Sequence, residues 1–382
     1  MTGFFTAPRI AWGPGAIEQL SGLDAHRAVV AVDHAVEGRD GARRITEELA
    51  KTDCAIEVVG LPEAPDRVDR IGVLVERLTA FAPDWLVVVG GGRAIDAAKA
   101  ARLGFERPGL DLRTALPGLD LDGPRRLRLA AVPTTSGSGS EASATVDLWT
   151  AEGVPFEFAH RALTPEWALL DPAFAASLSP DLLLDGGFEI AVQALEAYLS
   201  AWANPLSDAL AVDALATVLE RLPHALRWSE DPDAKAALHY AATAAGLAAS
   251  NAQRGVGHAL ARALSGPTGL SYGRLLGLLF LPVLEFDRAS ARDRLEALTT
   301  AVLRGENPVR TPLATRWGRL LETLRCPATL PAAGVDTSRL AAVRDQVIAH
   351  ALGSPAVLAN PRVPSPGDIG SFLDRIQGAR SL

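Results

Sequence analysis

Three consecutive glycines lie between a run of apolar residues and an alanine-rich segment, an arrangement that can bind an anion. The apolar run, residues 85–89, is too short for a helix and predicts a strand buried on both faces. Gly90, Gly91 and Gly92 then remove every Cβ atom from the turn, and residues 94–103 have good helix propensity. Unpaired N–H groups and the helix dipole would face a phosphate or pyrophosphate there. A tight turn without a ligand is the alternative, because the spacing is not G-x-G-x-x-G.

A second turn, rich in glycine and hydroxyl groups, follows another predicted strand. Residues 128–133 are mostly apolar, and residues 134–141 read T-T-S-G-S-G-S-E. In α/β sheets, ligands bind at the carboxyl ends of the strands. We therefore expect the two turns to lie at strand ends that face a ligand.

The chain changes character near residue 178. Before it, predicted strands alternate with predicted helices, which indicates a mostly parallel α/β sheet. After it, alanine- and leucine-rich segments have helical periodicity and no convincing strand interrupts them. The predicted helices cover residues 182–202, 207–222, 233–252, 275–286, 289–303, 312–324 and 337–352. We expect an α/β domain at residues 1–178 and an all-helical domain at residues 179–382, with ligands bound in a cleft between domains.

Composition excludes several classes of protein. No apolar run is long enough to span a membrane, and a net charge of −8 argues against a nucleic-acid partner. Cys54 and Cys326 are the only cysteines, which excludes a disulfide framework and a cysteine-cluster metal site. The N-terminus lacks the features of a signal peptide. We expect a soluble cytoplasmic protein.

With both turns considered, the chain resembles the iron-containing alcohol dehydrogenase family, whose fold is shared with dehydroquinate synthase and glycerol dehydrogenase. Matching motifs occur in the family's order over nearly the whole chain: P-R-I-A-W-G-P-G-A at 8–16, G-G-G-R at 90–93 with Asp96 and Lys99, P-T-T-S-G-S-G-S-E at 133–141, L-L-D-P at 169–172, E-A-Y at 196–198, and Asn251 with G-H-A at 257–259. The resemblance implies a nucleotide-binding α/β domain, a helical domain and hydride transfer between them.

The resemblance also implies which residues contact a nicotinamide nucleotide: Gly90, Gly91, Gly92, Arg93 and Asp96 in the first motif, Thr134, Thr135 and Ser138 in the second turn, and Leu170 beside the adenosine. Asp33 stands where the family's acid meets the adenosine ribose. A carboxylate there repels a 2′-phosphate, so NAD(H) is favoured over NADP(H), with helix capping as the alternative role. A lysine that helps to hold the nicotinamide ribose in relatives is absent near Pro155.

The family's metal-ligand set of one Asp and three His is largely replaced. Glu189 stands at the Asp position, Gln193 at the first His position and Tyr272 at the last, and His258 alone is retained. Iron(II) or zinc prefers two or more imidazole or thiolate donors. Arg262, in place of a further family histidine, would repel a dication. We expect no bound metal.

Without a metal, side chains must stabilise the charge that hydride addition creates on a carbonyl oxygen. Tyr272 is the leading proton donor, while His258 could be the acid instead or relay the proton to Tyr272. Arg262 could stabilise an oxyanion or bind a carboxylate or phosphate, and Glu189 would favour a cation such as a protonated imine. Structural alternatives stay open: Glu189 and Gln193 could fill a disused site, Arg262 could pair with Glu189, and His258 and Tyr272 could serve packing.

These residues predict a metal-independent NAD(P)H-dependent reductase of a small carbonyl or cyclic imine. A homodimer is expected by analogy with the family. The alternatives are a conventional metal-dependent alcohol dehydrogenase with atypical ligands, and a nucleotide-binding protein without catalytic activity.

Overall fold

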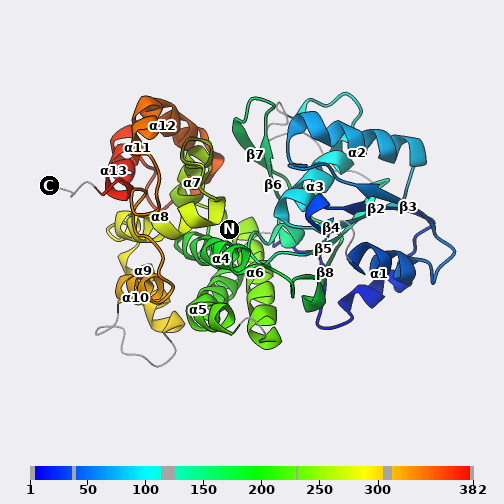
Figure 1. Cartoon of the computed structure of the whole chain (residues 1–382), viewed down its shortest axis with the longest axis horizontal. Coiled ribbons are helices and arrows are strands. Elements are labelled where there is room, and N and C mark those ends of the chain that lie inside the picture. Colours follow the sequence, from blue (N-terminus) through cyan, green and yellow to red (C-terminus); the bar gives the residue numbers. More distant parts are fainter. Residues whose placement is uncertain (1–4, 37–39, 113–124, 229–230, 304–311, 379–382) are drawn as a thin grey trace. The chain divides into compact units, whose positions relative to one another are not determined.

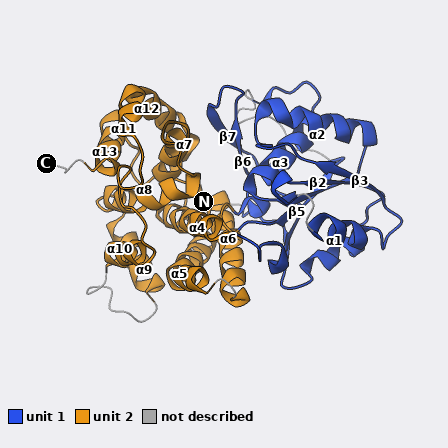
Figure 2. Ribbon diagram, viewed as in Figure 1, with its two compact units in different colours: residues 1–135, 139–178 blue, residues 136–138, 179–382 orange. Residues whose placement is uncertain are grey.

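The computed structural model of the chain describes residues 5–36, 40–112, 125–228, 231–303 and 312–378. The chain falls into two compact units, which Figure 2 shows in different colours. Unit 1 comprises residues 1–135 and 139–178, and unit 2 comprises residues 136–138 and 179–382. Three residues of the second turn therefore group with the helices of the second half.

A six-stranded sheet forms the centre of unit 1, with the strand order β1-β8-β5-β4-β2-β3 (Figure 1). Its strands are β1 (Arg9–Trp12), β2 (Arg27–Val32), β3 (Ala55–Gly60), β4 (Trp85–Gly90), β5 (Arg128–Pro133) and β8 (Trp167–Leu170). All neighbours run parallel, which confirms the predicted α/β sheet. The register pairs Gly90 with Pro133, so both glycine-rich turns begin at the same edge of the sheet.

Helices cover both faces of this sheet (Figure 1). The helices of unit 1 are α1 (Asp40–Leu49), α2 (Val68–Phe81) and α3 (Gly92–Glu106), with the short 3-10 helices η1 (Ala16–Gly22), η2 (His34–Val36), η4 (Ser140–Ala142), η5 (Arg161–Leu163) and η6 (Pro172–Phe174). Leu86 and Val88 of β4 pack in a core cluster with α2 and α3, while Val87 and Val89 pack in another with η1 and α1. Strand β4 is thus buried on both faces, as its apolar run predicts.

Three strands of unit 1 are absent from the sequence prediction. Strands β6 (Thr145–Trp149) and β7 (Pro155–Ala159) form an antiparallel hairpin, and β8 joins the main sheet. In β6, the buried Val146 and Leu148 alternate with half-buried residues. Alternation over so few residues leaves only a weak pattern in the sequence.

Unit 2 is helical, as predicted, and none of its described residues forms a strand. Its helices are α4 (Pro180–Leu199), α5 (Pro205–Arg227), α6 (Pro232–Ala252), α7 (Val256–Thr268), α8 (Tyr272–Asp287), α9 (Arg292–Val302), α10 (Leu313–Thr323), α11 (Thr337–Ala342), α12 (Arg344–Gly353), the 3-10 helix η7 (Pro355–Ala359) and α13 (Pro366–Ile376). The first three begin with proline after the capping residues Ser179, Asn204 and Asp231. Within the described ranges, no helix has the length and apolar character needed to cross a membrane.

Helix α4 is the central helix of unit 2 and packs against α5, α6 and α8. Glycines allow α8 to approach it closely. A Cβ atom added at Gly273 would lie 2.3 Å from the carbonyl oxygen of Asp185, and one at Gly277 would lie 2.5 Å from the Phe188 ring. Because Tyr272 directly precedes Gly273, this close packing positions the first turn of α8, and with it Tyr272, against α4.

Candidate active site

The first glycine turn has no room for side chains. A Cβ atom added at Gly90 would lie 2.6 Å from the Cβ atoms of both Ala94 and Asp33, and one at Gly91 would lie 3.1 Å from Thr135 Cγ2. Helix α3 begins at Gly92, and among the described residues no side chain caps its N-terminus. A bare backbone at an uncapped helix N-terminus fits the phosphate groups of a dinucleotide.

Asp33 directly follows β2, and its carboxylate lies at this turn. Its Oδ2 accepts a hydrogen bond from the Gly91 N–H at 3.1 Å, and its Oδ1 accepts one from the Ala35 N–H at 3.1 Å. The bond to the Ala35 N–H is the helix-capping contact that was the alternative role predicted for Asp33. The bond to the Gly91 N–H holds the carboxylate against the glycine turn, where a ribose role stays a prediction.

Arg93, in the first turn of α3, forms a two-point ion pair with Asp66. Its Nε donates to Asp66 at 2.8 Å and its Nη2 donates at 2.6 Å. The Arg93 side chain is 61% exposed, whereas that of Asp66 is buried. Hydrogen bonding to Asp66 raises the pKa of Arg93. Asp66 therefore fixes a permanent cation beside the glycine turn, where it could also meet a phosphate.

Asp96, predicted as a nucleotide contact, lies in a buried network instead. It is 7% exposed, accepts hydrogen bonds from Ser140 Oγ and the Asp147 N–H, and lies 3.4 Å from Lys99 Nζ. The fully buried Lys99 also donates to the Thr145 carbonyl at 2.9 Å. Burial raises the pKa of Asp96 to about 6, and the charge of Asp147 adds to this shift. We assign Asp96 a positioning role, because the network ties α3 to the segment that follows the second turn.

The second turn lies against the first within unit 1. The Thr134 N–H donates to the Gly90 carbonyl at 3.0 Å, and the Thr135 side chain fills the space that a Cβ atom of Gly91 would need. Leu170 is buried at the end of β8. The predicted contacts from β2, β4, β5 and β8 therefore all stand at the carboxyl ends of their strands.

In unit 2, three polar side chains share one face of α4. Glu189, Gln193 and Glu196 are four and three residues apart. Gln193 Nε2 donates to the Ser138 carbonyl at 3.1 Å, and a Cβ atom added at Gly137 would lie 2.7 Å from Glu189 Oε2. Residues of the second turn thus rest directly on the predicted catalytic face of α4.

The same face of α4 holds His258 of α7. His258 is 1% exposed, and its Nδ1 lies 2.5 Å from Glu196 Oε2. Burial lowers the pKa of His258, and the charges of Arg254 and Arg262 add to that shift against the opposing effect of Glu196. The rings of His258 and Tyr272 meet edge to face at 6.0 Å, and the Tyr272 hydroxyl is buried. Arg262 lies one turn further along α7 and is 7% exposed.

Two buried residues at this site have no role in the sequence prediction. Glu196 appears there only within the E-A-Y motif, although its spacing from Glu189 and Gln193 already indicates a shared helix face. His239 of α6 lies with its Nδ1 3.2 Å from Ser136 Oγ, and both side chains are buried. No sequence pattern links His239 to Ser136, because 103 positions separate them.

The side chains at the family's metal-ligand positions do not fit an iron or zinc site. Among the described residues, no group of three or more His, Cys, Asp or Glu side chains is placed to hold a metal ion. His258 does have the orientation of a ligand, with Nδ1 on a carboxylate and a buried Nε2 that bonds to none of the described residues. Its companions, Glu189, Gln193 and Tyr272, add no second imidazole or thiolate.

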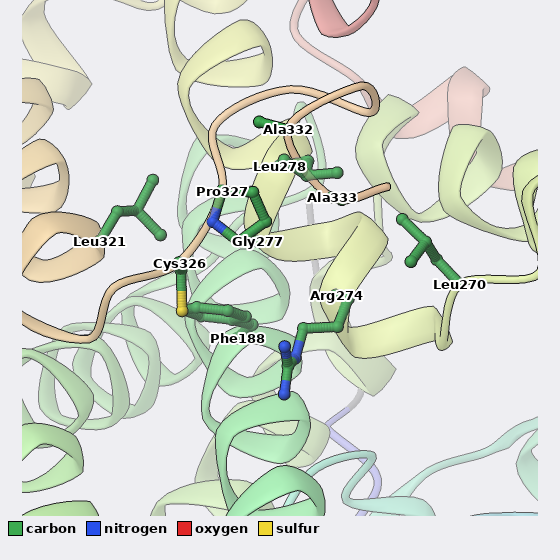
Figure 3. Close-up of a pocket in the computed structure, with 10 residues that line it drawn as sticks. All are labelled: Phe188, Leu270, Arg274, Gly277, Leu278, Leu321, Cys326, Pro327, Ala332 and Ala333. Carbon is green, nitrogen blue, oxygen red and sulfur yellow. The ribbon is translucent and has the colours of Figure 1, made fainter. Parts of the chain in front are cut away.

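A cavity of about 280 Å³ lies in unit 2, apart from these residues (Figure 3). Its lining comprises Phe188, Leu270, Arg274, Gly277, Leu278, Leu321, Cys326, Pro327, Ala332 and Ala333. Arg274 is already paired with Asp185 at 2.6 Å, and burial raises the pKa of the Cys326 thiol. None of the predicted catalytic side chains lines this cavity, so we do not assign the reaction to it.

Two family models match the chain: "Iron-containing alcohol dehydrogenase" over residues 7–172, and "Fe-containing alcohol dehydrogenase family, C-terminal" over residues 183–376. The NADPH-dependent butanol dehydrogenase of Clostridium saccharobutylicum is 26% identical over 94% of each chain. The 1-propanol dehydrogenase PduQ of Citrobacter freundii is 30% identical over 79% of this chain and 80% of its own. An iron-containing alcohol dehydrogenase structure from Thermococcus thioreducens has a TM-score of 0.90 at 26% identity, covering 99% of this chain and 100% of its own.

Substitution Gly90→Ala tests the glycine turn. The added methyl group would meet short, rigid neighbours at 2.6 Å, so the turn must move. We expect the Kd for NADH, measured by fluorescence titration, to rise about 10-fold or more, roughly 1.4 kcal/mol, with a lower Tm. Gly72→Ala in α2 is the control, since nothing lies within 4 Å of it, and should leave affinity unchanged. Unaltered NADH affinity in folded Gly90→Ala would contradict nucleotide binding at this turn.

Substitution Lys99→Met tests the buried network. Removing the cation leaves Asp96 buried and raises its pKa further, so we expect a loss of about 3 kcal/mol in the free energy of unfolding at pH 8. In the folded protein Asp96 has a pKa of about 6, so at pH 5 this carboxyl is largely protonated and has little charge for Lys99 to compensate. The stability lost in Lys99→Met should therefore be smaller at pH 5 than at pH 8. Denaturant unfolding of the native protein and the variant at both pH values measures this loss of stability. Exposed Lys51→Met should change little, and an equal loss at both pH values would refute the account.

Proposed function

The chain belongs to the iron-containing alcohol dehydrogenase family, and from this we propose that it is a metal-independent, NAD(P)H-dependent reductase of a small carbonyl compound or cyclic imine. Membership makes it an oxidoreductase of the NAD(P)-dependent alcohol dehydrogenase type. Metal independence, the substrate class and the side-chain roles are what the proposal adds. A homodimer in the cytoplasm stays a prediction.

The proposal depends on the donors at the four ligand positions. A single imidazole, His258, stands with the carboxylate of Glu189, the amide of Gln193 and the phenol of Tyr272. The Gln193 amide is also bound to the second turn through Ser138. A divalent transition metal would lack the nitrogen or sulfur donors that it prefers, so protein donors must replace its action on the substrate oxygen.

Tyr272 is the proton donor in this proposal. A bound NAD(P)H would supply the hydride, which leaves negative charge on the carbonyl oxygen. A phenol can donate a hydrogen bond to that oxygen and then its proton. His258 is the weaker candidate acid, because its Nδ1 already bonds to Glu196 and a neutral imidazole has no second N–H.

Two charged residues bear on the substrate. Glu189 is half-buried beside Gly137, and a carboxylate there favours a protonated imine, which needs no Lewis acid. Arg262, one turn from His258, could bind an acidic group of a carbonyl substrate. For the nucleotide, the Asp33 carboxylate favours NAD(H) over NADP(H).

A metal-dependent alcohol dehydrogenase with atypical ligands is the second candidate. One observation favours it: His258 keeps a carboxylate partner on Nδ1 and a buried Nε2, the arrangement common to metal-ligating histidines. The two candidates differ in whether turnover needs metal.

Chelator-treated protein, with metal content checked by mass spectrometry, provides the test. We expect it to reduce aldehydes, ketones or cyclic imines with NADH at the untreated rate, and added Fe²⁺ or Zn²⁺ to give no stimulation. Activity that is lost with the metal and restored by one equivalent per chain would establish the metal-dependent enzyme. NADH binding without turnover on the whole panel would indicate a non-catalytic protein.

Substitution Tyr272→Phe tests the proton donor. Loss of a general acid should lower kcat by about 10²-fold or more, while the Kd for NADH stays within about two-fold. Tyr198→Phe is the matched control, because its ring instead packs against Arg294, with the guanidinium carbon 4.5 Å from the ring centre. Steady-state kinetics and fluorescence titration measure both effects. Equal kcat values for the two variants would remove Tyr272 from the reaction.

A further inference from the structure

Glu196 of α4 is buried and binds the start of helix α7. It is 3% exposed, and its two oxygens accept three N–H donors. These are the Gly255 N–H at 2.9 Å, the Gly257 N–H at 2.5 Å and His258 Nδ1 at 2.5 Å. One carboxylate therefore binds the N-terminus of α7 and the imidazole on its first turn.

The sequence G-V-G-H allows this approach. A Cβ atom added at Gly257 would lie 2.8 Å from Glu196 Oε1, and one at Gly255 would lie 3.0 Å from the same atom. Side chains at either position would push the carboxylate away from the helix end. Both glycines are therefore needed for Glu196 to reach His258 and the backbone together.

This contact selects one tautomer of His258. Glu196 already acts as an acceptor for two backbone N–H groups, so the proton in its bond to His258 lies on Nδ1. In the neutral imidazole, Nε2 then carries a lone pair. This atom is buried and bonds to none of the residues that the structure describes. A buried acceptor in that state is costly unless a ligand supplies a donor.

We propose that Glu196 is a positioning residue that holds His258 with Nε2 as the hydrogen-bond acceptor for an N–H or O–H group of the substrate. This rests on the proposed function and narrows its substrate class. The iminium N–H of a protonated cyclic imine, or the hydroxyl of the alcohol in the reverse direction, supplies such a donor. A carbonyl oxygen does not, and must be met by Tyr272.

A purely structural role for Glu196, capping α7, can be separated from positioning. Asn360 caps the same helix end, since its Oδ1 accepts the Val256 N–H at 3.1 Å. Its Nδ2 donates to Asp287 and to the Arg362 carbonyl, and His258 is not among the hydrogen-bond partners described for Asn360. Asn360→Ala therefore loosens the N-terminus of α7 without touching the imidazole.

The first experiment compares Glu196→Gln with Asn360→Ala by kinetics and Tm. Glutamine has one acceptor oxygen in place of two, so in either orientation its NH2 group would face the N–H of Gly255 or Gly257, and the three hydrogen bonds cannot all be kept. The imidazole of His258 then loses its fixed orientation. We expect kcat to fall about 10²-fold in Glu196→Gln, with the Kd for NADH within about two-fold. Asn360→Ala should lower Tm but keep kcat within about three-fold. Equal losses of kcat would reduce Glu196 to a cap and overturn the proposal.

The second experiment does not need turnover. Long-range ¹H–¹⁵N spectra of histidine-labelled protein, assigned with His258→Asn, should show Nδ1–H in the native protein and a smaller share of that tautomer in Glu196→Gln. Pyrrolidinium added with NADH should shift the Nε2 resonance of the native protein. A native Nε2–H tautomer would refute the inference even if the reductase is active. Absence of turnover on every substrate, with the expected tautomer and shift, would instead refute the proposed function alone.

Discussion

The carboxylate of Glu196 is the interaction on which the candidate site depends, because it joins α4 to α7. Its two oxygens bind the end of one helix and the only histidine that the ligand positions retain. Helix α4 presents Glu189 and Gln193 on the same face. Since α8 is packed onto α4 through glycines, Tyr272 belongs to the same rigid arrangement. Residues from three helices thus meet at α4, where the Glu196 carboxylate holds α7 and two glycines let α8 pack closely.

Close approach through glycine recurs in both units. In unit 1, Gly90 and Gly91 let Asp33 and Thr135 reach the turn between β4 and α3. In unit 2, a Cβ atom at Gly186 would lie 1.9 Å from the Ser136 carbonyl oxygen, so α4 and the second turn touch through backbone. Because glycine has no Cβ atom, the backbone approaches its neighbours at these places more closely than a bulkier residue would allow.

The proposed replacement of a metal by side chains depends on which donors stand at the ligand positions. A divalent ion combines charge, polarisation and orientation in one atom, whereas the proposed reductase divides them among several groups. The phenol of Tyr272 can donate, the imidazole of His258 can accept, and the carboxylate of Glu189 supplies negative charge. Nucleotide binding does not involve the metal-ligand positions. The glycine turn can therefore keep the family's pattern although the ligand positions depart from it.

Sequence alone determined the parts that local chemistry specifies. The apolar run at 85–89 and the glycines after it predicted β4, the turn and α3, and alanine-rich periodicity predicted the helical unit. The hairpin of β6 and β7 was not predicted, because a short half-buried strand has only a weak hydrophobic pattern. Only the tertiary structure decided that Asp96 turns into a buried network with Lys99 and that Glu196 holds His258. The bonds of Asp96 to Ser140 and Asp147, and of Glu196 to His258, join residues 44, 51 and 62 positions apart. Their cost or benefit depends on burial, which no local pattern encodes.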